Sequence, residues 1–188
     1  MKKKIVLSIL CIIVSLSLFA QTDNAGHLRF DGIPIDGTLQ SFVDKMREKG
    51  YRQIRKREFA GRDCAMMKGR FASVKVRFSI LSVPSKDYLV YSVLAIFHGK
   101  KSSELISKYY RLKDELSKEC GYPLRCVENS GPSPLFNDSE WIGQHSAYFR
   151  VPEGVILLKI IQEADCVAIT YFDSINFEIY KAERGNVE

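Results

Sequence analysis

Histidine is scarce in this chain of 188 residues, and its three copies lie far apart. His27, His98 and His145 form no HxH, HExxH or HxxxH pair, so the sequence has no local zinc motif. It also lacks the G-x-S-x-G turn of a serine nucleophile, a glycine-rich phosphate loop and a C-x-x-C pair. The sequence therefore predicts no metal site and no cofactor, and an enzyme is not the favoured interpretation.

Long apolar stretches are equally few. The run from Ile5 to Phe19 covers 15 residues, whereas a membrane-spanning helix needs about 20 mostly apolar residues. Three lysines precede this run, and Ala20 separates it from a polar stretch, which are the three parts of a secretory signal. We therefore expect a signal peptide over residues 1–20, with an uncleaved anchor as the alternative. Cys11 lies inside the apolar run, so a lipid-attached cysteine after cleavage is not expected.

Excess charge is small once this segment is removed. The whole chain carries +6, but three of its 28 basic residues lie in the first four positions, so 25 basic and 22 acidic residues leave +3. Such a balance gives no general argument for binding nucleic acid. The remaining residues, 21–188, are enough for one domain, which we expect to work in the periplasm or as a secreted protein, without stable membrane insertion.

Four cysteines remain after the expected cleavage. In an oxidising compartment an even number predicts disulfides, and four cysteines allow three pairings. The spacing between Cys120 and Cys126 allows a small closed loop but does not decide the pairing. Buried thiols fit the same sequence, and a catalytic or zinc-bound thiol is the further alternative. The candidates are Cys64, Cys120, Cys126 and Cys166.

Two segments have the period of an amphipathic helix. In the first, Thr38 is a suitable N-cap, and the apolar positions that follow share one stripe up to Gly50. In the second, Ser102 is the expected cap and Gly121 the expected end. A third, short helix is expected from Asp173 onward, capped by Asp173 or Ser174. The apolar stripes consist of Leu39, Phe42, Val43 and Met46 in the first helix and Leu105, Tyr109, Leu112 and Leu116 in the second.

Most of the remaining chain has the period of strands. Between positions 74 and 80 apolar and polar residues alternate, as in a strand with one buried face. Further strands are predicted over Cys64–Phe71, with Gly69 as a possible bulge, and over Tyr88–Phe97. After the second helix, strands are predicted near 124–127, 146–151, 155–161 and 166–172.

The two helices are each followed by strands, which indicates an internal repeat. Lys49-Gly50-Tyr51 and Cys120-Gly121-Tyr122 occur at the two helix ends, 71 positions apart. We therefore predict an α+β fold in which two helices cover one face of an antiparallel sheet, built from α-β-β-β units over about 38–99 and 102–172.

The segment Phe30-Asp-Gly-Ile-Pro-Ile-Asp-Gly37 and the ending Ile169-Thr-Tyr-Phe-Asp-Ser-Ile-Asn176 resemble a group of uncharacterised exported proteins of Gram-negative anaerobes. The resemblance spans nearly the whole chain after the signal and implies no activity. The doubled helix-and-sheet layout also resembles the beta-lactamase inhibitory proteins, in layout only. No inhibitor motif is present to carry over.

Basic residues gather in one part of the chain. From Arg52 to Arg77 there are nine of them, against Glu58 and Asp63. Lys75 and Arg77 share the polar face of one predicted strand, so part of the cluster is expected on the exposed side of the sheet. The alternative is a solvated face whose charges prevent edge-to-edge pairing. The candidate partner-binding residues are Lys68, Arg70, Lys75 and Arg77.

Aromatic residues give a second set of candidates. Tyr110 is expected to be exposed on the second helix, because its neighbour Tyr109 belongs to the apolar stripe. Phe136 and Trp141 occur in or beside an irregular segment rich in Ser, Gly, Pro and Asn, which predicts a surface loop. Such residues often anchor interfaces, although they also fold back over a core.

These observations favour an exported binding protein of the cell envelope that is not an enzyme. Its expected partner is a protein or an anionic envelope component, and its expected binding surface is the open sheet face with the loop near Trp141. The alternative is a small periplasmic hydrolase or thiol enzyme whose residues converge only in three dimensions.

Overall fold

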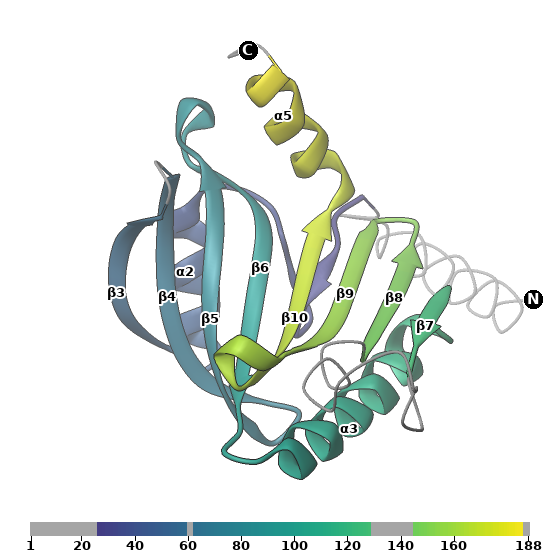
Figure 1. The fold of residues 1–188 in the computed structure, drawn as a ribbon. Coiled ribbons are helices and arrows are strands. Elements are labelled where there is room, and N and C mark those ends of the chain that lie inside the picture. The colour runs from purple at the N-terminus through teal and green to yellow at the C-terminus, as the bar shows by residue number, and fades with distance from the viewer. Residues whose placement is uncertain (1–25, 60–61, 129–144, 186–188) are drawn as a thin grey trace, which may run out of the picture.

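The computed structural model describes residues 26–59, 62–128 and 145–185 (Figure 1). In these ranges the protein is α+β, with a large antiparallel sheet, a short hairpin and three α-helices. The hairpin is β1 (Arg29–Phe30) with β2 (Ile33–Pro34), and the helices are α2 (Leu39–Glu48), α3 (Ser102–Cys120) and α5 (Ser174–Gly185). The sheet contains β3 (Arg52–Phe59), β4 (Arg62–Phe71), β5 (Val74–Val83), β6 (Leu89–His98), β7 (Arg125–Val127), β8 (Ser146–Val151), β9 (Gly154–Ile161) and β10 (Cys166–Asp173).

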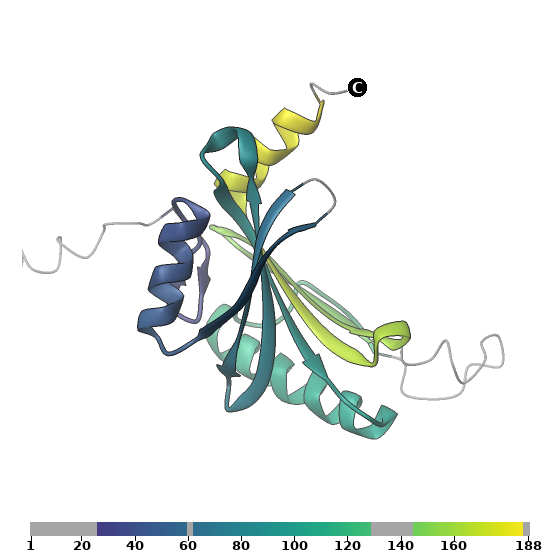
Figure 2. The same cartoon turned by 90° about the vertical axis from the view of Figure 1, so that its left-hand side faces the viewer.

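The eight strands follow the order β3-β4-β5-β6-β10-β9-β8-β7, and every neighbouring pair is antiparallel. The chain therefore fills one half of the sheet up to β6 and then the other half from β7 to β10. The two halves meet where β6 pairs with β10. Figure 2 shows the strong twist of the sheet, with α2 beside one half and α3 beside the other.

The first predicted helix is confirmed at both ends. Thr38 is extended, and its hydroxyl accepts a hydrogen bond from the Ser41 backbone N–H at 3.2 Å. Gly50 follows the helix with φ at +91°, a conformation that glycine adopts at little cost.

The second helix begins differently from the prediction. Ser102 is its first helical residue, and the preceding Lys101 forms no side-chain cap. Glu104 in the first turn reaches back instead, and its carboxylate accepts a hydrogen bond from the Lys100 backbone N–H at 2.9 Å. The carboxylate thus ties the residue before the N-cap to the first turn, and its negative charge lies at the positive end of the helix.

Seven of the eight sheet strands coincide with predicted ones, but β3 was not predicted. Its sequence, Arg-Gln-Ile-Arg-Lys-Arg-Glu-Phe, has no apolar alternation because this strand forms an edge of the sheet.

The predicted bulge at Gly69 is also wrong. Gly69 pairs regularly with Val76, and the irregularities of this half lie between Gln53 and Arg55 and between Leu81 and Ser82.

One core cluster fills the space between the helices and the sheet. The apolar stripes of α2 and α3 are buried in it, as the helical period predicts. Val76, Phe78 and Ile80 of β5 belong to the same cluster, and the hairpin adds Phe30, whose ring stacks at 5.3 Å on Phe71. Alternate residues of β5 therefore point away from this core.

A buried polar joint attaches the hairpin and α5 to the sheet. Asp173, fully buried at the end of β10, accepts hydrogen bonds from the Leu28 backbone N–H at 2.8 Å and the Asn176 backbone N–H at 2.9 Å. His27 Nδ1 lies 3.1 Å from the same carboxylate. The Asn176 amide then donates to the carbonyls of Ile35 and Val90. Asp173 is thus the predicted cap of α5 and also a tertiary link.

Replacing Asp173 with alanine should lower the free energy of unfolding by about 2–3 kcal/mol, because two buried backbone donors and His27 lose a charged acceptor. Asp173→Asn should cost less, since one acceptor oxygen remains. Urea unfolding followed by circular dichroism measures both. Ser174→Ala, at the exposed neighbouring position, is the control and should stay within about 0.5 kcal/mol.

Candidate functional site

The basic residues of the first half form two rows across neighbouring strands. In one row Arg52 of β3 lies opposite Lys68 of β4, which lies opposite Arg77 of β5. In the other row Arg70 lies opposite Lys75. All five side chains are exposed. The strand register thus gathers the four predicted basic candidates and adds Arg52 to them.

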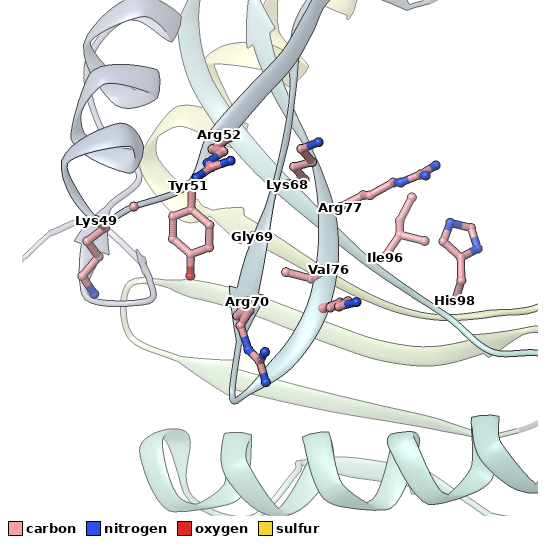
Figure 3. A pocket seen from close by; sticks show the side chains of 12 residues that line it. Lys49, Tyr51, Arg52, Lys68, Gly69, Arg70, Val76, Arg77, Ile96 and His98 are labelled. Carbon is pink, nitrogen blue, oxygen red and sulfur yellow. The ribbon is translucent and has the colours of Figure 1, made fainter.

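These rows lie on the side of the sheet opposite the core cluster, which we call the outer face. Val76, Phe78 and Ile80 of β5 point into the core, so the intervening Lys75 and Arg77 point outward. Ile96 lies directly opposite Arg77 on β6 and is half-buried on this face. Figure 3 shows Lys68, Arg77 and His98 on this side of the strands.

A groove of about 740 Å³ runs past the two rows and around β4 at Gly69 (Figure 3). We call it the basic groove. Its walls carry six Lys or Arg side chains and one histidine, and none of the described lining residues is acidic. The lining residues are Lys49, Gly50, Tyr51, Arg52, Lys68, Gly69, Arg70, Lys75, Val76, Arg77, Ile96 and His98.

The groove keeps its shape because Gly69 has no side chain. A Cβ atom at this position would lie 2.1 Å from Cδ1 of the Tyr51 ring, so any other residue would displace the ring. The Tyr51 hydroxyl donates a hydrogen bond to Asp31 at 2.7 Å. Burial and this carboxylate raise the pKa of Tyr51, so its phenol remains a proton donor at physiological pH. Tyr51 is therefore a fixed wall of the groove.

The charges of the rows are poorly compensated. Like charges placed directly opposite each other on neighbouring strands are destabilising. Within the described part of the chain, none of the five basic side chains of the rows forms an ion pair with a carboxylate. Arg70 donates to the Ser73 carbonyl at 2.9 Å, which leaves its charge unneutralised. These like charges repel one another in the folded protein, and they would attract an anion.

The predicted aromatic candidates do not join this groove. Tyr110 is 37% exposed on α3, as expected, but its ring packs edge-on to His145 and lies under the Lys113 ammonium at 5.3 Å. Tyr110 is therefore part of a separate corner between α3, β7 and β8. Phe136 and Trp141 lie outside the described residues.

None of the four predicted disulfide candidates belongs to a disulfide within the described residues. Cys64 and Cys166 are buried on β4 and β10, which are not neighbours in the sheet. Cys120 is half-buried at the end of α3, whereas Cys126 is exposed and directed toward Tyr109. The expectation of disulfides therefore has no support among the described residues.

Cys126 has the most polar surroundings of the four. Its Sγ lies 3.8 Å from the Tyr109 hydroxyl and 3.9 Å from Lys113 Nζ, and Lys113 forms a 2.6 Å ion pair with Glu128. Burial and a hydrogen bond to Glu128 raise the pKa of the Cys126 thiol, and the opposing effects of Tyr109 and Lys113 do not offset this. The thiol is therefore not activated as a nucleophile.

The thiol-enzyme alternative also needs a cysteine hydrogen-bonded to a histidine. Cys166 lies opposite His98 across the β6–β10 pair, but no hydrogen bond joins them. Cys120 and Cys126 have no histidine partner either among the residues that the structure describes. The buried Nδ1 of His145 lacks a hydrogen-bond partner there and is not placed to accept a proton from these thiols.

Comparisons with known proteins add no assignment: no family model, curated protein or solved structure matches the chain. In the described ranges no group of three or more His, Cys, Asp or Glu side chains is placed to hold a metal ion. No described helix is both long and apolar enough to cross a membrane. We therefore take the basic groove, with six basic side chains in its walls, as the candidate functional site.

The raised pKa of Cys126 can be measured by its rate of alkylation. Because only the thiolate reacts, Cys126 should react with iodoacetamide more slowly at neutral pH than a model thiol of pKa 9.0, although it is the exposed thiol. Glu128→Gln removes the negative charge and weakens the acceptor that favour the protonated thiol, and it should increase the rate. Peptide mass spectrometry over a pH series measures this, with the half-buried Cys120 as internal comparison. A neutral-pH rate above that of the model thiol would instead indicate an activated nucleophile.

Proposed function

We propose that this chain is an exported binding protein, without enzymatic activity, that holds an anionic partner in the basic groove. The partner is an anionic component of the cell envelope or an acidic protein. The observation that carries this proposal is the pair of cationic rows, which lie side by side on β3, β4 and β5 with no carboxylate among the described lining residues. A fold gains nothing by itself from such repulsion, whereas an anionic ligand gains from every charge in it.

The export part of the proposal rests on the first twenty residues. Three lysines, an apolar run to Phe19 and the small residue Ala20 are typical of a cleaved signal. The protein then works in the periplasm or outside the cell, where acidic glycans, phosphorylated lipids and acidic proteins are available. Nucleic acid is not the proposed partner, because the compartment is unsuitable and the charge after cleavage is only +3.

The proposed architecture is a tandem repeat whose two helices cover the same face of the sheet. It is supported by the order of elements, since α2 precedes β3 to β6 and α3 precedes β7 to β10. Each unit is then α-β-β-β-β rather than α-β-β-β. A glycine with positive φ follows each helix, Gly50 at +91° and Gly121 at +77°. The tyrosines after them differ, because Tyr51 is buried and Tyr122 is 95% exposed, so only the first unit forms the groove.

Export predicts a defined mature chain. Expression of the whole sequence in a Gram-negative host should give a protein that begins at Gln21 and lies in the periplasmic or extracellular fraction. Intact-mass spectrometry of each fraction measures this. Replacing Ala20 with a bulky residue should reduce cleavage, because signal peptidase sites require a small residue there. An unprocessed chain in the cytoplasmic fraction of the unsubstituted protein would contradict export.

Charge reversal tests the groove as the binding site. The variant Lys75→Glu/Arg77→Glu should retain its fold, because both side chains are exposed, and should lose at least roughly tenfold of its partner capture from envelope extracts. Capture by the unsubstituted protein should also weaken as salt is added, since the interaction is electrostatic. Quantitative mass spectrometry of the captured material provides the measurement.

The chain offers a matched control on the same face. Arg150 and Lys159 are exposed residues of β8 and β9 in the other half of the sheet, so Arg150→Glu/Lys159→Glu makes the same change of charge outside the groove. Its capture should remain near that of the unsubstituted protein. Equal losses in both variants would show that total charge matters and the groove does not, and unchanged capture in both would remove the groove from the proposal.

A further inference from the structure

The basic groove is bordered by an apolar strip on the outer face. Leu94 and Ile96 of β6, and Leu157 and Ile161 of β9, are half-buried there. The strand register places Ile96 directly opposite Arg77 and, on its other side, opposite Ala168 of β10. Cations and apolar side chains are therefore next to each other on one surface.

The two rows of basic side chains are separated by a distance that the sheet geometry sets. Residues two positions apart along a strand are about 7 Å apart, and neighbouring strands are about 5 Å apart. The row of Arg52, Lys68 and Arg77 and the row of Arg70 and Lys75 are thus separated by about 7 Å along the strands. This layout provides two neighbouring places for anionic groups. Three of these five residues are arginines, whose planar fork binds phosphate oxygens in pairs.

On this basis we infer that the basic groove takes a lipid whose headgroup carries two phosphates, with its acyl part on the apolar strip. This inference rests on the proposed function and names its ligand class. Each phosphate lies against one cationic row, and the hydrocarbon covers Ile96 and Leu94. The phosphates remain partly hydrated in the open groove, whereas the apolar strip loses contact with water.

An acidic peptide fits the same surface less well. The backbone groups of β5, β6 and β10 are used in the sheet, since each of these strands has a partner on both sides. A peptide lying over the apolar strip would bury its own amides without partners, which costs free energy for every group left unpaired. An acyl chain has no such groups.

A single-stranded nucleic acid fits less well for a different reason. Binding of its bases requires exposed aromatic rings on which they stack. Of the two ring-bearing residues that line the groove, Tyr51 is buried against Gly69 and His98 is exposed. A single exposed ring does not stack successive bases, so phosphate contacts would dominate.

Vesicle flotation of the proposed mature protein, residues 21–188, tests the inference. One set of phosphatidylcholine vesicles contains cardiolipin, with two phosphates per molecule, and another contains phosphatidylglycerol, with one, at equal total charge. Binding to the cardiolipin vesicles should be at least about tenfold stronger, and pyrophosphate should compete with it. The apolar run from Ile5 to Phe19, which would itself enter the vesicles, is absent from every sample.

Three variants assign the binding to the groove and strip. Lys75→Gln/Arg77→Gln should abolish the preference for cardiolipin, whereas Arg125→Gln/Arg150→Gln, which removes two exposed charges from β7 and β8 outside the groove and strip, should preserve it. Ile96→Thr keeps a β-branched residue in the strand but removes apolar surface. It should weaken vesicle binding severalfold and leave the competition by pyrophosphate unchanged. Thermal melting checks that each variant remains folded.

The outcomes separate this inference from the proposed function. Equal binding to both lipids, or binding unaffected by Lys75→Gln/Arg77→Gln, overturns the two-phosphate lipid. If polyglutamate binds in a manner that depends on these two residues while cardiolipin does not, the ligand class is wrong and the proposed anionic site stands. If no anionic probe depends on them, both the inference and the proposed function fail.

Discussion

The antiparallel pairing of β6 with β10 is the constraint on which the rest of the molecule depends. Seven residue pairs join the two strands, and they link a half made from the chain before α3 to a half made after it. A slip of one residue would turn every side chain of one half to the opposite face. The register therefore directs the apolar side chains of both halves into one core. It also places Arg77, Ile96 and Lys159 on the same outer face.

The same register explains why like charges lie opposite each other in the first half of the sheet. The inner faces of β4 and β5 supply core residues such as Met67 and Phe78, so the strands cannot shift to separate the charges on their outer faces. Lys68 must lie opposite Arg77, and Arg70 opposite Lys75. The core holds these repelling residues in place, and a ligand can then meet a fixed array of charges without first ordering it.

The sequence predicts those parts of the fold in which one residue pattern determines one structure. The helical stripe after Thr38 and the alternation around Phe78 are local signals, and both elements form as predicted. The edge strand β3 has no such signal, because water surrounds its edge and charged residues suit that position. The basic candidates could be found from composition, but Arg52 and His98 join them only through strand register, and the role of Gly69 depends on a ring 18 positions away.

Four cysteines outside any disulfide are physically compatible with the proposed export. Cys64 and Cys166 are buried, so oxidants do not reach them, and they lie on strands that are not neighbours. Oxidation and disulfide exchange require the thiolate, and burial raises the pKa of Cys120, Cys126 and Cys166. The exposed Cys126 is thus kept protonated by its surroundings and by the acceptor Glu128. An oxidising compartment therefore does not require disulfides in this fold, whose large buried core makes such cross-links unnecessary for folding.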